Sequence, residues 1–449
     1  MPASCAGGPR VREMGRREFL RILGLGTAGL AAGCAVNPVT GESQLMLVSE
    51  QDEIRIDRAN RAHQFSADYG VLQDRGLNDY VDGTGRRIAS MTHRPQMPYS
   101  FRGVNAPYVN AYAFPGGSIA CTRGILLELE NEGQLAALLG HELGHVNARH
   151  TAQRMSKSAL VSAAVGGLSA IAASGDSLLG DLVSGLGGIG AGALLAKYSR
   201  DNEREADGLA LTYMTRAGYS PEGMVGLLDM LRRTSDRKPN ALELMFSTHP
   251  MSEERYARAE EAVRTRYRDD LGRPLHRDRY MDRTAGLRAV KGAIEAMQEG
   301  DKAMGRKAWS EADVQYRRAL AIAPEDYAAL VKCAECQAAR KRYAEARRYA
   351  EAAQQVYPGE ARAYSVSGIS RLMERDWDGA YEELSAYDER LPGNPGITFL
   401  KGLSLEGMGR RRDAAQAYYD YLQAVSSGEQ AQYAYNRLVE WGYVRRPQQ

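Results

Sequence analysis

The stretch His141-Glu-Leu-Gly-His145 decides how the rest of the chain is interpreted. Asn131 and Gln134 have the spacing of an N-cap and its reciprocal partner, and apolar residues then recur with helical spacing, which predicts a helix from about residue 132. Because the two histidines are four residues apart, their rings share one face of this helix and can bind one metal ion, with Glu142 beside them. The alternative is a surface helix whose two histidines have no common role.

A catalytic zinc ion usually has three protein ligands, and the third candidate lies on another predicted helix. A third histidine of the metzincin type is excluded, because Ala148 and Thr151 stand where that motif has Gly and His, and His150 is out of register. Further along, Glu203 and Asp207 fall on the apolar face of a helix. Metal ligation by Glu203, and support of a zinc-bound histidine by Asp207, would compensate two carboxylates that face a core. The alternative is an exposed, acidic helix start.

The N-terminus has the features of a bacterial export signal. Arg16-Arg17 followed by Phe19-Leu20 is typical of a twin-arginine signal, and the apolar run that follows is too short to span a bilayer. Residues 31–34, Ala-Ala-Gly-Cys, resemble a lipobox, although Leu30 stands one place early. We therefore expect residues 1–33 to be a signal peptide and Cys34 to be lipidated, which would anchor the protein to a membrane. An uncleaved signal anchor is the alternative.

Two bodies are expected after the signal peptide. From about 37 to 285, helical stretches alternate with strand-like ones, the latter around a turn at 115–117, which predicts an α+β domain. From 288 to 449 no strand pattern remains, and prolines, aromatic residues and small residues each recur every 34 residues. This period predicts an all-α superhelix of about four tetratricopeptide repeats with a C-terminal capping helix. Such a superhelix offers a concave surface for binding peptides or for docking to an assembly.

The charge balance excludes a general affinity for nucleic acid. The chain has 58 Lys and Arg against 56 Asp and Glu, a net charge of +2, so no overall field attracts phosphates and we expect no nucleic-acid partner. Hydrophobic residues make up 44% and charged residues 25%, which argues against a disordered chain or a multi-span membrane protein.

Taken together, the motifs resemble those of the M48 metallopeptidases, a gluzincin group with a zincin-like α+β fold. The resemblance covers residues 37–265 and rests on 141–145, on Glu203-x-x-x-Asp207 and on the stretch 110–117, Asn-Ala-Tyr-Ala-Phe-Pro-Gly-Gly. It implies one Zn²⁺ per chain, bound by His141, His145 and Glu203. It also implies that Glu142 is the catalytic base and that Asp207 supports a ligand.

A second part of the resemblance concerns the stretch 247–250, Ser-Thr-His-Pro. In the family, the histidine of such a loop approaches the metal, either as an inhibitory ligand or as support for the transition state. His249 is therefore a candidate catalytic residue, and Arg255 follows it. We expect substrate to lie extended along the strand that contains Asn110, Ala111 and Ala113, because pairing of backbones accepts many sequences.

The layout as a whole resembles periplasmic members of the family that degrade misassembled outer-membrane proteins and assist their assembly. The resemblance implies a zinc-dependent endopeptidase for unfolded envelope proteins, held at the outer membrane as a lipoprotein. Its repeats would then contact the outer-membrane assembly machinery. The rival hypothesis is a chaperone or assembly factor, in which the repeats bind partners and the peptidase is latched. A third hypothesis, a lipid-tethered scaffold, would not need an intact Glu142.

Overall fold

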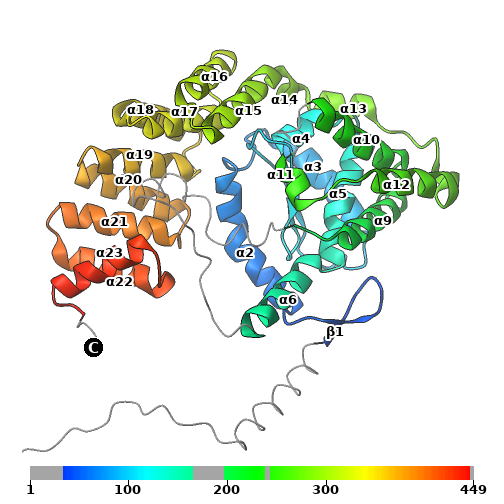
Figure 1. Ribbon diagram of the computed structural model, residues 1–449. Coiled ribbons are helices and arrows are strands. Elements are labelled where there is room, and N and C mark those ends of the chain that lie inside the picture. The colour runs from blue at the N-terminus through cyan, green and yellow to red at the C-terminus, as the bar shows by residue number, and fades with distance from the viewer. Residues whose placement is uncertain (1–33, 165–196, 238–242, 445–449) are drawn as a thin grey trace, which may run out of the picture.

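The computed structural model describes residues 34–164, 197–237 and 243–444 (Figure 1). The predicted signal peptide, residues 1–33, lies outside them. Of the predicted lipidation site, Cys34, only the backbone is described, at the start of the short strand β1 (Cys34–Val36), which pairs with β2 (Ser43–Leu45). Among the helices of the described ranges, none combines the length and the apolar character that crossing a membrane requires.

A three-stranded sheet lies inside the first body, in the order β3-β5-β4. Its strands are β3 (Ser100–Val104), β4 (Ala111–Ala113) and β5 (Ser118–Thr122), with β3 parallel and β4 antiparallel to β5. Gly117, at φ +101°, allows the tight turn between β4 and β5. The predicted strand, turn and strand in this stretch are confirmed. Among the described residues, β4 pairs with β5 alone and is therefore an edge strand.

Helices surround this sheet and complete an α+β body. Their bounds are α2 (Glu50–Ala67), α3 (Arg75–Ala89), α4 (Arg123–Glu128), α5 (Glu132–Asn147), α6 (His150–Ala164), α9 (Arg200–Arg216), α10 (Glu222–Arg237), α11 (Glu243–Thr248), α12 (Glu253–Thr265), α13 (Arg277–Arg283) and α14 (Ala285–Ala289). Helix α5 is buried along its whole length and contacts β4, α9 and α10. It starts at the predicted residue, with the Asn131 side chain accepting from the N–H of Gln134 at 2.9 Å. The predicted reciprocal bond is wrong in detail, because Gln134 accepts from the N–H of Glu130 instead.

Two glycines bring α5 and α9 unusually close together. A Cβ atom on Gly144 would lie 2.9 Å from both the Cα and the carbonyl oxygen of Ala206, and one on Gly140 would lie 3.2 Å from the Cα of Ala210. The missing side chains therefore let the two helices touch backbone to backbone. This contact sets the acidic face of α9 against the histidines of α5.

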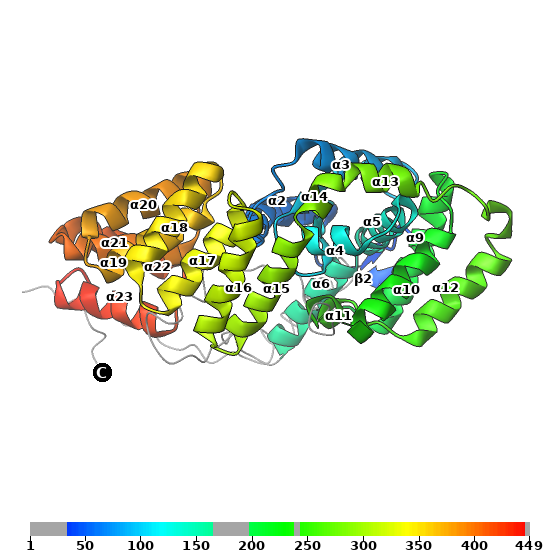
Figure 2. The ribbon, with the colours of Figure 1, turned by 90° about the horizontal axis from the view of Figure 1, so that it is seen from above.

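The second body consists of helices alone within the described ranges, arranged as antiparallel pairs (Figure 2). The second helix of each pair begins 34 residues after the one before, at Trp309, Tyr343, Trp377 and Arg411, as the sequence period predicts. The bounds are α15 (Lys291–Gly305), α16 (Trp309–Ile322), α17 (Tyr327–Ala339), α18 (Tyr343–Val356), α19 (Arg362–Met373), α20 (Trp377–Arg390), α21 (Pro395–Gly407), α22 (Arg411–Ala424) and α23 (Glu429–Glu440). Helix α23 packs on the last pair.

The first body packs directly against the repeated helices of the second body. The ring of Tyr69, just after α2, lies between Lys332 of α17 and Arg362 of α19, 4.4 and 4.5 Å from their cationic groups. Its hydroxyl accepts from Lys332 at 2.9 Å, and Arg362 also donates to the carbonyl of Ala67 at 2.7 Å. One hydrophobic core continues from the first body into α15–α19. The two bodies are therefore joined by a buried, specific interface.

Candidate metal centre

Four buried side chains from three parts of the fold converge on one point. His141 and His145 come from α5, Glu203 from α9 and His249 from the turn after α11, and their ligand atoms all lie within 4.8 Å of one another. The two Nε2 atoms are 3.1 Å apart. Glu203 reaches both rings, with Oε2 at 3.5 Å from His141 and Oε1 at 3.4 Å from His145. Two imidazoles and a carboxylate are a donor set that zinc prefers.

The protonation states suit a metal ion. Burial lowers the pKa of His145 well below its usual value, which keeps the ring neutral, as metal binding requires. Burial alone would raise the pKa of Glu203, but the charge on His249 holds it below the usual range. His145 therefore presents a neutral nitrogen beside the ionised carboxylate of Glu203.

The environment of Glu142 is the clearest indication that this centre binds a metal ion. Both of its carboxylate oxygens are buried and make no hydrogen bond within the described part of the chain. The nearest charged partner is Nε2 of His249, at 3.8 Å. Burial raises the pKa of Glu142. An unpaired buried carboxylate is costly, and a metal ion with its water would compensate it. The residues present therefore fit zinc.

Asp207 and Arg255 support the centre from outside. Asp207 Oδ1 lies 3.0 Å from Nδ1 of His141, so this ring donates there and turns the lone pair of Nε2 toward the other ligand atoms. Arg255 donates to both oxygens of Asp207, at 2.7 Å each, and pairs with Glu203 Oε2 at 2.7 Å. Burial would raise the pKa of Asp207, but Arg255 and His141 keep it below its usual value.

His249 stands inside the cluster of ligand atoms. Its Nδ1 lies 3.1 Å from Glu203 Oε1 and 3.3 Å from Nε2 of His141. The backbone N–H of His249 donates to the carbonyl of Met245 at 2.7 Å, which fixes the turn at the end of α11. Burial would lower the pKa of His249, but the charges of Glu203 and Glu142 raise it above the usual value. The ring of His249 therefore lies in direct contact with two of the candidate ligand side chains.

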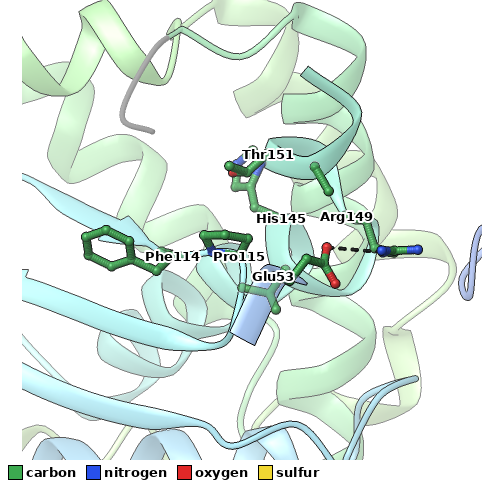
Figure 3. A pocket seen from close by; sticks show the side chains of 9 residues that line it. Glu53, Phe114, Pro115, His145, Arg149 and Thr151 are labelled. Atoms are coloured by element: carbon green, nitrogen blue, oxygen red, sulfur yellow. Dashed lines mark hydrogen bonds and ion pairs between the residues drawn. The ribbon is translucent and has the colours of Figure 1, made fainter. Parts of the chain in front are cut away.

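The proposed substrate strand lies next to the centre. Asn110 precedes β4, which contains Ala111 and Ala113 and packs against α5, and all three residues are buried. Ala113 lines a small pocket together with Phe114, Pro115 and His145, the last three of which are labelled in Figure 3. The ion pair between Glu53 and Arg149, 3.1 Å long, borders this pocket. The edge strand and one candidate metal ligand, His145, therefore line the same pocket.

Sequence reasoning missed three residues around His145. His150 begins α6 directly after Arg149, whose φ of +58° turns the chain. The Nδ1 atom of His150 lies 2.9 Å from Nδ1 of His145. Glu205 Oε2 lies 3.1 Å from Nε2 of His150. The ring of Tyr198 is stacked on that of His145, with centroids 3.8 Å apart. The spacing of His150 excludes it from a metzincin ligand set, but spacing alone does not reveal its contact with His145.

Comparison with known proteins agrees with this geometry. Residues 76–263 match the family model described as Peptidase family M48. The beta-barrel assembly-enhancing protease of Escherichia coli (strain K12) is 32% identical over 209 residues, 43% of this chain and 42% of that protein. Metalloprotease YcaL of the same strain is 30% identical over 211 residues, 46% of this chain and 75% of that protein. Mitochondrial metalloendopeptidase OMA1 of Schizosaccharomyces pombe is 32% identical over 182 residues, 40% of this chain and 52% of that protein. The chain spans about half the length of the beta-barrel assembly-enhancing proteases that it matches.

Proposed function

Because the chain belongs to peptidase family M48, we propose that it is a zinc-dependent endopeptidase that cleaves unfolded or misassembled proteins of the bacterial envelope. The observation that carries this proposal is the unpaired carboxylate of Glu142, buried beside the convergent donor atoms of His141, His145 and Glu203. A purely structural histidine cluster would have no use for such a carboxylate.

Each residue then has a role in peptide hydrolysis. His141, His145 and Glu203 would hold a zinc ion, which would supply a Lewis acid for the attacking water and the scissile carbonyl. Glu142 would take the proton of the attacking water and deliver it to the leaving amine, and burial raises its pKa, which helps it to accept the proton. Asp207 and Arg255 hold His141 in the required tautomer.

Substrate backbone would pair with β4. An extended peptide added to this edge strand would pass the pocket wall that contains His145, because Ala113 and His145 line the same pocket. Recognition by backbone hydrogen bonds places few demands on side chains, so broad specificity for unfolded chains is expected. The names of two relatives support outer-membrane β-barrel proteins as the substrate class.

The remaining parts of the proposal concern location and partners. A cleaved signal peptide and lipidation at Cys34 would hold the enzyme at the outer membrane, facing the periplasm. The helical pairs of the second body, with their 34-residue period, would act as tetratricopeptide repeats that contact the assembly machinery. The part of these repeats that faces the first body is already occupied by Tyr69, so such a partner would bind elsewhere on the second body.

A second candidate is an enzyme that His249 holds inactive and that acts mainly as a chaperone, and one observation favours it. His249 lies within 3.3 Å of both Glu203 and His141, where it would fill a coordination position. In that state the protein would bind unfolded chains more often than it cleaves them.

The decisive experiment compares the purified protein with Glu142→Gln, which keeps the shape of the side chain and removes the base. Bound zinc is measured first, and cleavage of an unfolded protein is then followed for both. Glu429→Gln, a change at an exposed acid of α23, is the matched control. We expect one zinc per chain in all three proteins and loss of cleavage in Glu142→Gln alone. Absence of zinc from the parent, or equal cleavage by parent and Glu142→Gln, would refute the assignment.

A further inference from the structure

A second hydrogen-bonded chain leads away from the metal centre, on the Nδ1 side of His145. His145 Nδ1 lies 2.9 Å from His150 Nδ1, and His150 Nε2 lies 3.1 Å from Glu205 Oε2. The side chains of both histidines are almost fully buried, whereas that of Glu205 is 29% exposed. The chain therefore begins at a candidate metal ligand and ends at a carboxylate that water can reach.

With Glu205 ionised and His150 neutral, each of the two hydrogen bonds has only one possible direction. An ionised carboxylate only accepts, so Nε2 of His150 must donate to Glu205. A neutral His150 then has a lone pair on Nδ1, and a contact of 2.9 Å between two ring nitrogens requires the other one, Nδ1 of His145, to carry the proton. It follows that Nε2 of His145 has the lone pair, and this is the atom that faces His141 and Glu203.

From this arrangement we infer that His150 and Glu205 are positioning residues for His145, and that they fix both its tautomer and its ring orientation for metal binding. The inference rests on the proposed zinc site. Asp207 fixes the tautomer and the orientation of His141 directly, by a hydrogen bond of 3.0 Å to Nδ1. For His145, the carboxylate of Glu205 acts through one intervening imidazole, that of His150.

The local fold explains why a relay is used on this side. Helix α5 ends at Asn147, and the left-handed conformation of Arg149 sends the chain back so that the first residue of α6 lies against the last turn of α5. His150 thus occupies the position next to Nδ1 of His145. Tyr198 closes the other side by stacking on the His145 ring, at an interplanar angle of 22°. Between these two neighbours the His145 ring has little freedom to rotate.

Metal affinity in the full-length protein tests the inference, because it can be measured without any peptidase assay. The zinc dissociation constant is determined by competition with a chelator for the parent and for His150→Ala, His150→Asn and Glu205→Ala. The matched control is His93→Ala, which removes a histidine that contacts Tyr213, outside the donor cluster. The visible spectrum of the cobalt-substituted proteins reports the ligand geometry. Unfolding of the zinc-free proteins shows whether each variant folds.

We expect His150→Ala to weaken zinc binding by about 10- to 100-fold and to alter the cobalt spectrum, because loss of an outer partner of a ligand has effects of this size. His150→Asn should recover most of the affinity, since its amide oxygen can accept from Nδ1 of His145. Glu205→Ala should weaken binding severalfold. Should His150→Ala fail to fold, Glu205→Ala alone decides, because its side chain is partly exposed.

The possible failures can be told apart. A parent that binds no zinc would refute the proposed function itself. A parent that binds zinc, together with a Glu205→Ala or His150→Ala affinity equal to that of His93→Ala, would refute the positioning role alone. The same conclusion would follow if His150→Asn were no better than His150→Ala, since this would mean that the imidazole matters only for packing.

Discussion

Arg123 at the start of α4 and Asp326 before α17 form a buried, bidentate ion pair between the two bodies of the protein. Nη1 and Nη2 of Arg123 lie 2.6 and 3.1 Å from the two carboxylate oxygens of Asp326, and both side chains are less than 10% exposed. Burial would raise the pKa of Asp326, but Arg123 holds it below its usual value. Asp326 also caps α17 by accepting from the N–H of Ala329.

Removing one partner of this pair should destabilise the protein strongly. Arg123→Met leaves a buried carboxylate without its counter-ion, so we expect the apparent free energy of unfolding in urea to fall by about 3 kcal/mol. Arg123→Met combined with Asp326→Asn should recover part of this loss, because the amide oxygen keeps the cap. Arg410→Met, at an exposed pair with Asp413, is the control and should change stability by less than about 1 kcal/mol. A loss no larger than that of the control would contradict the interface described above.

The close contact of α5 and α9 predicts that Gly144→Ala is damaging. The new Cβ would meet the Ala206 backbone at 2.9 Å, so α9 must move and carry Glu203 with it. We expect a loss of stability of about 1–3 kcal/mol and weaker zinc binding, measured by thermal unfolding and by chelator competition. Gly208→Ala, in the same helix α9 with nothing within 4 Å, should bind zinc normally and gain up to about 1 kcal/mol. Equal zinc affinity in both variants would show that the spacing of the helices does not set the site.

His249→Ala should raise peptidase activity severalfold. The ring of His249 lies where it would compete with water and substrate, 3.3 Å from Nε2 of His141, and its removal opens that position. Turnover of an unfolded protein at saturating zinc is the measurement, with Glu142→Gln/His249→Ala as the inactive control. A decrease in activity would instead mean that His249 stabilises the oxyanion of the transition state.

Glu360, at the interface between the bodies, predicts a specific pH dependence. Burial raises the pKa of Glu360 above 4.5, and hydrogen bonds from Ser66 and Tyr327 offset this only in part. Because the carboxyl group of Glu360 has a higher pKa in the folded than in the unfolded state, its contribution to stability is fully present below the unfolded-state pKa. This contribution is lost as the pH rises through the folded-state pKa.

Glu360→Gln should remove that loss, because the amide stays neutral and can still accept a hydrogen bond from Tyr327. Relative to the parent, the variant should therefore gain stability between pH 4 and pH 7. Melting temperatures of both proteins across this range provide the test. A constant difference between the two curves would contradict it.

The parts of the structure that sequence reasoning could predict are those set by local periodicity. Helical spacing placed the start of α5 at residue 132, and the helical wheel put Glu203 and Asp207 on the buried face of α9. The 34-residue period predicted the spacing of the helices in the second body, because each pair repeats the same local contacts.

What could not be predicted depends on contacts between distant segments. The strand order β3-β5-β4 needs the chain to cross over, and no local pattern encodes that. The relay through His150 depends on the left-handed turn at Arg149, a residue type that seldom adopts this conformation. No helical pattern could show that the Glu205 side chain would meet a histidine from another helix.

The position of Tyr69 has a consequence for protein engineering. Its backbone adopts φ +64°, its ring is held by two cations of the second body, and the next residue, Gly70, leaves no room for a side chain beside Tyr357 and Glu360. A chimera that exchanged the repeats for those of another protein would lose these matched surfaces, even if the graft were made at the linker between the bodies. A working hybrid would have to transplant the segment around Tyr69 together with the repeats, so the natural unit of exchange is discontinuous in sequence.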